Sequence, residues 1–290
     1  MSAFFDVYLL EAALNGILLG GVFALLALGL NLVFGVIDVV WICYAELIMF
    51  GMYGMYFLYV TYHVPFALAA LVSIAGVGCL GVLLHVAVIQ PLLGTPPINQ
   101  LLATGGVLFF LQGAATVLFG IDFRNLGIRM PIVEVGGMYV SYARLLAFAA
   151  SLAGMASLFL FLSRSYTGTA IRAIAQDRQI MPLMGVDARR IYLITSAIGG
   201  ALAALASSLL VLQYDVQPFV GLTFGPITFV ICVLGGLGNM VGGFVAAFLF
   251  AEIISVSGLY FDLEWGYVFA FGFFVVLMFF RPQGLLARRS

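Results

Sequence analysis

"SRSYTGTAIRAIAQDRQIMPLMGVDARR", residues 163–190, is the most polar stretch of a chain that is otherwise almost wholly apolar. It carries five arginines: Arg164, Arg172, Arg178, Arg189 and Arg190. The runs on either side of it are long and apolar enough to cross a bilayer, which takes about 20 residues in a helix. The segment therefore separates two groups of predicted membrane helices and is itself expected outside the hydrocarbon core.

The composition is that of a membrane protein. Hydrophobic residues make up 64% of the 290 residues and charged residues only 8%, whereas about a quarter of the residues of a soluble domain are charged. The expected fold is all-α, a polytopic transmembrane helical bundle that occupies residues 1–290 as a single domain. The net charge of −1 argues against nucleic acid as a partner.

Apolar runs predict about nine spans, within a range of eight to ten. They fall at residues 9–34, 37–62, 65–90, 99–120, 143–163, 191–213, 220–257 counted twice, and 265–280. The run 220–257 contains "VLGGLGNMVGG", which fits either two short helices joined by a tight turn or a broken, re-entrant element. The N-terminal stretch carries Asp6 and Glu11 but no basic residue before the first run, unlike a cleaved signal peptide, so the first helix is expected to be retained.

Arginines predict the orientation, because short loops rich in basic residues stay in the cytoplasm. Segment 164–190 and the chain end, with Arg281, Arg288 and Arg289, are both expected inside, which puts the N-terminus outside. The loop 121–142 then lies outside, and its Gly, Pro, Val and Ile residues predict a short extended or hairpin segment.

Residues from Thr169 to Met181 predict a short amphipathic helix between the fifth and sixth spans. Ile171, Ile174 and Ala175 share one face, and Pro182 and Gly185 are expected to end or bend the helix. One interpretation is a solvated loop whose arginines fix the topology or contact anionic lipid. The other is a docking element for a cytoplasmic protein, favoured by the small residues that permit close approach.

Polar residues inside the apolar runs are candidates for function, since they are expensive in lipid. They are Asn15, Asn31, Asp38, Glu46, Gln112 and Glu252, and Asn239 stands in the Gly-rich break. For a translocation pathway the candidates are Glu46, Gln112, Asn239 and Glu252, with a hydrogen bond to a neighbouring helix as the alternative role for each carboxylate.

No metal site is expected. Cys43, Cys79 and Cys232 lie in apolar runs and are expected to be small buried hydrophobes, and the two histidines stand alone. Trp41 and Trp265 are expected at the membrane interfaces.

Several stretches, in order along the chain, resemble the permeases that import branched-chain amino acids through ABC transporters. They are "ALLALGLNLVFGV" (24–36), "AELIMFGMY" (45–53), "LLATGGVLFFLQ" (101–112), "GTAIRAIAQDRQIMPLMGVDARRIYLITSAIGGALAALAS" (168–207), "FVICVLGGLGNMVGGFVAAFLFAE" (229–252) and "FFRPQGLL" (279–286). The resemblance covers nearly the whole chain. It implies a subunit of the bacterial inner membrane that imports branched-chain amino acids or a related small amino-acid or amide substrate.

The resemblance also implies partners, because such a permease is not itself an enzyme. The chain has no lysine and hence no G-x-x-x-x-G-K-[ST] motif, so ATP with Mg²⁺ would be held by two cytoplasmic ATPase subunits and no cofactor by this chain. A periplasmic binding protein would deliver the substrate. A second, related permease, or a second copy, would complete the pore.

The polar segment 164–190 matches the family's ATPase-coupling pattern at Gly168, Arg172, Ala173, Asp177 and Gly185. A small Ala173 lets a helix sit in a groove, Arg172 and Asp177 can hydrogen-bond its rim, and Gly185 permits a turn. The chain departs from the family at Met181 and Pro182, where an alanine and a non-proline residue are usual.

A second departure is "WICYAE" (41–46), which replaces an Asn-Phe-Ala-His-Gly-Glu type of run and keeps only Glu46.

Two other classes of protein are alternatives. A self-powered, ion-coupled secondary transporter would use intramembrane carboxylates such as Glu46, Glu252 and Asp38 as ion ligands, but it leaves the Arg-rich helix unexplained. An intramembrane enzyme would need a nucleophile with its base, or a metal motif such as H-E-x-x-H, and the sequence has neither.

Overall fold

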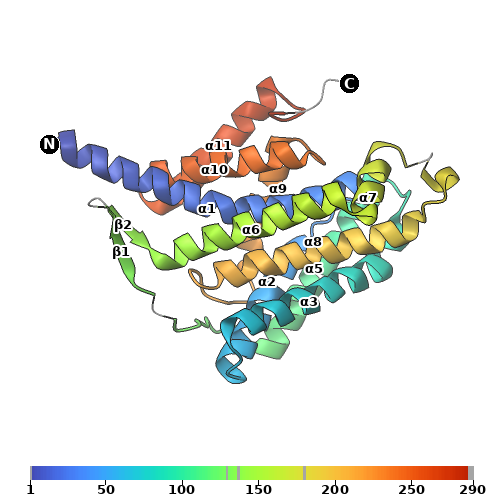
Figure 1. Cartoon of the computed structure of the whole chain (residues 1–290), viewed down its shortest axis with the longest axis horizontal. Helices are drawn as coiled ribbons and strands as arrows, with labels where there is room; N and C mark the ends of the chain where they lie inside the picture. The colour runs from blue at the N-terminus through green and yellow to red at the C-terminus, as the bar shows by residue number, and fades with distance from the viewer. Residues whose placement is uncertain (1, 129, 136–137, 179–180, 287–290) are drawn as a thin grey trace.

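Long apolar helices form most of the computed structural model, which describes residues 2–128, 130–135, 138–178 and 181–286 (Figure 1). Six stretches of the described chain are long and apolar enough to span a bilayer. They belong to α1 (Ser2–Ile37), α3 (Phe66–Leu84, with its continuation to Leu92), α5 (Pro97–Phe119), α6 (Tyr142–Arg164), α8 (Ala188–Leu210) and α10 (Met240–Tyr260).

The remaining helices are shorter. Three are apolar: α2 (Tyr44–Tyr56), α9 (Val220–Gly235) and α11 (Leu263–Phe280). The fourth, α7 (Tyr166–Gln176), is amphipathic, with Ile171 and Ile174 buried and Arg172 exposed. Single turns complete the set: π-helical turns at Phe57–Thr61 and His85–Ile89, α4 at Gln90–Leu92, and a 3₁₀ turn at Met181–Met184.

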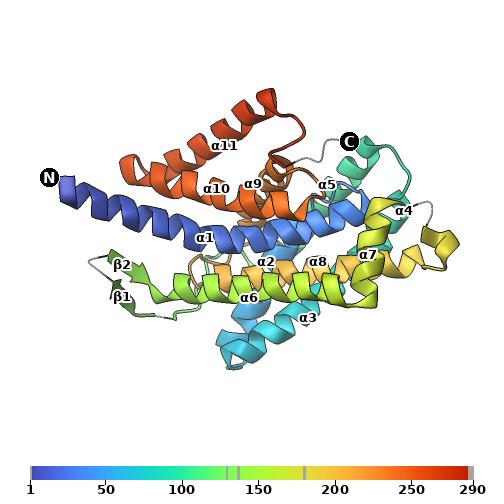
Figure 2. The same cartoon turned by 45° about the horizontal axis from the view of Figure 1, so that its top comes forward.

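Helix α1 is the centre of the bundle. It packs against α6, α8, α9 and α10, and both views show it between α10 and α6 (Figures 1 and 2). Small residues let the backbones approach, as at Gly35, where a β-carbon would lie 3.1 Å from the Cα atom of Gly238. Since lipid is as apolar as a leucine side chain, such close packing is what holds membrane helices together.

The two ends of the bundle differ. One end, called here the α7 end, carries α7, the end of α1 and the start of α8 (Figure 2). The other, called the hairpin end, carries the N-terminus and the strands β1 (Ile132–Val135) and β2 (Met138–Ser141), which pair antiparallel with Ile132 opposite Ser141. The hairpin predicted in the loop 121–142 is therefore confirmed.

The predicted span 37–62 is wrong as a single helix. Helix α1 ends at Ile37, and Asp38 takes a φ of 57°, a left-handed conformation that Asp tolerates better than most residues. The chain then runs without helix through 38–41 and a turn at 42–43 to α2, which has 13 residues and continues as the π-helical turn Phe57–Thr61. Segment 38–43 is therefore non-helical, although the sequence predicts a membrane-spanning helix there.

The Gly-rich break is a tight turn at residues 236–239, where Gly236 and Gly238 both have positive φ, 98° and 79°. Of the two interpretations of 220–257, two helices joined by a turn is thus confirmed. Helix α9, with 16 residues, is however shorter than a full span.

The amphipathic helix is shifted from its predicted bounds. It begins at Tyr166 because the Ser165 hydroxyl accepts a hydrogen bond from the Gly168 amide, 2.8 Å, and so caps the helix. It ends at Gln176, before Met181. Ala175 is exposed rather than on the buried face with Ile171.

Two expectations about buried side chains also need correction. Cys43 and Cys232 are free and buried as expected, but Cys79 is exposed on α3. Trp41 is buried rather than interfacial, whereas Trp265 is half exposed.

Candidate functional site

Helices α2 and α9 both begin inside the bundle, not at its ends. The Tyr44 hydroxyl lies within hydrogen-bond distance of two backbone carbonyls that share its one hydrogen, those of Leu26, 3.3 Å, and Gly199, 3.4 Å. These carbonyls lie three turns from the α7 end along α1 and α8, about 16 Å at a rise of about 1.5 Å per residue. Since the hydrocarbon core is about 30 Å thick, α2 starts near mid-depth.

The start of α9 lies against the start of α2. A β-carbon on Gly225 would lie 2.6 Å from the β-carbon of Ala45, and one on Gly221 would lie 3.1 Å from the Ala45 carbonyl oxygen. A side chain at position 225 would clash with Ala45, and one at position 221 would crowd the Ala45 backbone. Discontinuous helices that begin at mid-depth are the arrangement in which transporters build substrate sites.

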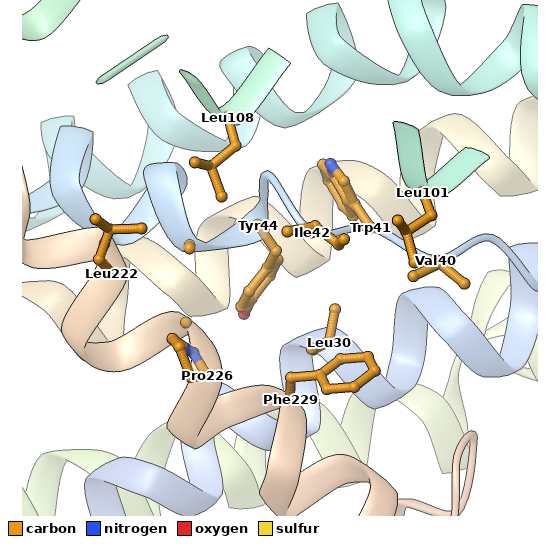
Figure 3. Close-up of a pocket in the computed structure, with 13 residues that line it drawn as sticks. Leu30, Val40, Trp41, Ile42, Tyr44, Leu101, Leu108, Leu222, Pro226 and Phe229 are labelled. Atoms are coloured by element: carbon orange, nitrogen blue, oxygen red, sulfur yellow. The ribbon is translucent and has the colours of Figure 1, made fainter. Parts of the chain in front are cut away.

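A cavity of about 300 Å³ opens beside this junction and is called here the mid-depth cavity. Figure 3 shows its side chains converging from α1, α5, α9 and the segment before α2. They are Leu30, Val40, Trp41, Ile42, Tyr44, Ala45, Leu101, Leu108, Gly221, Leu222, Gly225, Pro226 and Phe229. The Tyr44 hydroxyl is engaged by backbone carbonyls, so the side chains offer apolar surface, which suits an aliphatic ligand group.

Pro226 adds a backbone feature to the cavity wall. It lies inside α9 and has no N–H, so it cannot donate to the carbonyl of Leu222 one turn earlier. Leu222 and Pro226 both line the cavity. The first turns of α9 therefore lack one intrahelical hydrogen bond at the surface of the cavity.

Glu46 lies in the first turn of α2, next to Gly221 of the cavity lining. Its side chain is fully buried, and neither carboxylate oxygen has a hydrogen-bond partner among the described residues. A β-carbon on Gly221 would lie 2.7 Å from Oε1 of Glu46, so the carboxylate faces the start of α9. A buried carboxylate without a partner costs stability, which marks Glu46 as a functional candidate.

The other predicted pathway residues lie elsewhere, and none of them lines a described cavity. Glu252 on α10 packs on Gly16 of α1. Gln112 is buried on α5, one turn beyond Leu108, and its Nε2 atom has no described partner. Asn239 caps α10: its Oδ1 accepts from the Gly242 amide, 3.0 Å, and its Nδ2 donates to the Leu286 carbonyl, 2.7 Å.

Asn15 and Asn31 of α1 each form a hydrogen bond to another segment of the bundle, as their positions in a tightly packed helix suggest. Asn15 accepts from Arg144 of α6 at 2.7 Å, and Asn31 accepts from the Gly238 amide at 3.1 Å. Both are therefore structural contacts of α1.

The five residues of the predicted coupling pattern have different surroundings. Gly168 is buried where α7 packs on the end of α6, and a β-carbon there would lie 2.5 Å from the Cα atom of Leu162. Arg172 is exposed, Ala173 is half-buried, and Asp177 follows the last residue of α7. Gly185 has a φ of 80°, so it makes the turn that was expected of it.

Asp38 and Arg178 form a contact that the sequence does not reveal. Nη1 of Arg178 lies 3.4 Å from Oδ2 of Asp38 and donates to the Ile37 carbonyl at 3.1 Å. A second cavity, of about 530 Å³, lies beside this pair and is called here the α7-end cavity. The loop after α7 is thereby joined to the end of α1.

Residues 12–278 match the family described as the permease component of branched-chain amino acid transport systems. The chain belongs to this family. The permease is 30% identical over 296 residues to BraD of Pseudomonas aeruginosa, with 96% of each chain covered. It is 26% identical over 313 residues to LivH of Escherichia coli K12, covering 97% of the permease and 96% of LivH. Both are named high-affinity branched-chain amino acid transport system permease proteins.

The fold of the permease is also seen in a solved structure. A chain of PsaBC from Streptococcus pneumoniae, in complex with Fab, superposes with a TM-score of 0.53 over 93% of the permease and 91% of that chain. With 14% of residues identical, this likeness concerns the fold alone. The family match over residues 12–278 confirms the resemblance drawn from the sequence motifs.

Some residues of the site could not be predicted from the sequence. Trp41 and Ile42 look like ordinary apolar residues, yet they form one wall of the permease's mid-depth cavity. The run "GLTFGP", residues 221–226, did carry a signal, because two glycines and a proline are unusual inside an apolar helix. The sequence carried no signal for the role of Arg178, because its partner Asp38 is 140 positions away in the chain.

Proposed function

We propose that this permease is the membrane-spanning subunit of an ATP-driven ABC importer. It translocates branched-chain amino acids, or a related small amino-acid or amide substrate, delivered by a periplasmic binding protein. The family match over residues 12–278 carries the proposal. The chain supplies the path through the membrane and not the chemistry of ATP hydrolysis, which belongs to partner subunits.

The proposed topology has nine crossings in the bacterial inner membrane. Six are made by the long helices, and three by α2, α9 and α11 together with the non-helical segments that precede α2 and α9. The α7 end is cytoplasmic in this topology, because Arg164, Arg172, Arg178, Arg189 and Arg190 lie in or beside α7 and the start of α8, and Arg281 follows the last residue of α11. The N-terminus is then outside and the C-terminus inside.

Helix α7 is the proposed coupling helix. Its apolar side is already covered by α1, α6 and α8, which leaves Arg172 and its neighbours facing outward for a cytoplasmic ATPase. Two ATPase subunits would hold ATP and Mg²⁺, one under each of two paired permeases. The second permease is a related chain or a second copy of this one.

The proposed place for the substrate's side chain is the mid-depth cavity. Its aliphatic and aromatic walls suit a branched hydrocarbon group. The cavity also lies where two short helices begin, the position at which many transporters bind substrate.

The ion-coupled alternative rests on Glu46 and Glu252, because both carboxylate oxygens of Glu46 and Oε2 of Glu252 are buried without a described hydrogen-bond partner. Against it, Asp38 is paired with Arg178, Glu252 packs on a different part of α1, and no group of three potential metal ligands occurs among the described residues. An ion site needs several oxygen ligands in one place.

Purification from the native membrane tests the proposal. The tagged chain is captured in mild detergent, and the proteins that accompany it are identified by mass spectrometry. ATPase subunits and a second permease, lost when residues 169–185 are mutated, would support the importer. A chain that emerges alone and moves leucine in vesicles along an ion gradient, without ATP, would replace the importer with the secondary transporter.

A further inference from the structure

Segment 38–43 separates the two cavities. Val40 lines both of them, the mid-depth cavity on one side and the α7-end cavity on the other. The neighbouring residues Gln100 and Leu101 of α5 line one cavity each. The stretch around Val40 is thus a thin wall of non-helical chain between an apolar chamber at mid-depth and a more polar chamber at the α7 end.

Helix α5 holds this wall on one side. The Val40 amide donates to Oε1 of Gln100, 3.4 Å. The Thr104 hydroxyl can donate either to the Val40 carbonyl, 3.0 Å, or to the Gln100 carbonyl of its own helix, 2.8 Å. Both partners are side chains. They can exchange one hydrogen bond for another without unwinding a helix, so the wall is less firmly fixed than a strand or a helix would be.

The loop after α7 holds the wall on the other side. Arg178 stands two residues beyond the end of α7, and its guanidinium reaches both the Ile37 carbonyl and the Asp38 carboxylate. Asp38, with its left-handed φ, is the residue at which the chain leaves α1 and enters the wall. A displacement of α7 is therefore passed directly to the first residue of segment 38–43.

We infer that Arg178 is a positioning residue that transmits movement of α7 to segment 38–43, and that this segment closes the passage between the two cavities. The inference rests on the proposed function, in which ATPase subunits move α7. The pair is partly exposed, at 36% for Arg178 and 61% for Asp38, so its loss should affect folding little. Loss of the pair should instead affect the coupling of ATP hydrolysis to transport.

The test uses the complex of the permease with its ATPases and binding protein in liposomes. Arg178→Gln and Asp38→Asn each remove the ion pair, and Asn also tolerates a positive φ. Each should lower the leucine transported per ATP hydrolysed by about five-fold or more, the lower end of coupling between sites. The double variant should be no worse than either single one, because the two residues act together, and Arg178→Lys should restore most of the ratio.

Arg190→Gln is the matched control. It removes an arginine of the same end whose ion pair with Asp187, 3.2 Å, lies within the first turn of α8 and does not touch the wall. An unchanged ratio in Arg178→Gln, or an equal fall in the control, would overturn the inference. Uptake without ATP by the unaltered complex would instead overturn the proposed function, and the inference with it.

A second measurement needs neither ATP nor partners. Cys43 ends segment 38–43, is fully buried, and accepts a hydrogen bond from Nε1 of Trp41 at 2.9 Å. With Cys79 and Cys232 changed to alanine, a charged maleimide applied from the α7 side should label Cys43 several-fold faster in Arg178→Gln than in the parent. Equal labelling would show that Arg178 does not hold the wall.

Discussion

The carboxylate of Glu46 faces Gly221, so the first turn of α2 meets the first turn of α9 with no room for a side chain between them. A β-carbon at position 221 would lie 2.7 Å from Oε1 of Glu46 and 3.1 Å from the carbonyl oxygen of Ala45. The carboxylate can rotate away, but the Ala45 backbone cannot. This contact fixes how closely the two short helices approach at mid-depth.

Gly221→Val should therefore force α9 away from α2. Overpacking of this kind costs about 1–3 kcal/mol, and we expect a lower midpoint of thermal unfolding in detergent together with loss of leucine uptake. Gly113→Ala on α5 is the control, since a β-carbon there meets no atom within 4 Å. Equal stability of the two variants would show that the helices do not meet as described.

The variant Glu46→Gln distinguishes the effect of the buried carboxylate on stability from its effect on transport. The amide keeps the size of the side chain and removes a charge that has no described partner, so the unfolding midpoint should stay the same or rise. Uptake should fall by about ten-fold or more if the charge serves transport, as its burial without a partner suggests. A variant with normal uptake would leave Glu46 with no part in translocation.

Most of the fold was predictable from the sequence, because composition and helix length are linked in a membrane. The long helices, the hairpin at 132–141 and the amphipathic α7 follow from apolar runs, from Gly and Pro residues and from helical periodicity. The interruption at 38–43 was not predictable. An apolar non-helical stretch buried in a bundle has the same composition as a helix, and only the backbone of Asp38 reveals the change.

The site was predictable only where a residue is unusual in its own surroundings. Glu46 stands out as a carboxylate in an apolar run, and the structure buries it at the junction of α2 and α9. The cavity beside it is built of common residues such as Leu108 and Phe229, which come from helices distant in the sequence. The sequence also did not reveal that Asn239, a polar residue in a Gly-rich break, caps α10.

Charge reversal on α7 tests its proposed docking surface. Arg172→Glu combined with Asp177→Arg should uncouple ATP hydrolysis from uptake and leave membrane insertion unchanged, because the Arg172 side chain is exposed and supports no packing. We expect at least about a five-fold loss of stimulated ATPase activity. The double variant leaves the net charge unchanged, so Arg189→Glu, on the exposed start of α8, serves as the control for a charge reversal elsewhere at the same end. Normal stimulated hydrolysis and uptake in the double variant would remove the docking role.

Asn239→Ala should weaken the fold without touching the pathway. It removes the cap of α10 and the hydrogen bond to the Leu286 carbonyl, and loss of such a cap costs about 1 kcal/mol. The unfolding midpoint in detergent should fall, whereas uptake per folded molecule should not change. Asn239→Ser, which can still cap, should recover most of the stability. A selective loss of uptake at normal stability would instead support the predicted role of Asn239 in the pathway.

Leu108→Trp should narrow the mid-depth cavity from its α5 side, since Leu108 is buried and lines it. If the cavity receives the substrate's side chain, uptake of leucine and isoleucine should fall more than uptake of alanine, because only the larger groups compete with the indole for space. One methylene in such a pocket is worth about ten-fold or more in discrimination, so competition between labelled leucine and alanine in one vesicle preparation measures the effect directly. Leu118→Trp adds the same bulk to the outer face of α5, where the side chain is 70% exposed, and should leave the ratio unchanged. A uniform loss for all amino acids in Leu108→Trp would mean that the cavity supports the helices and does not select the substrate.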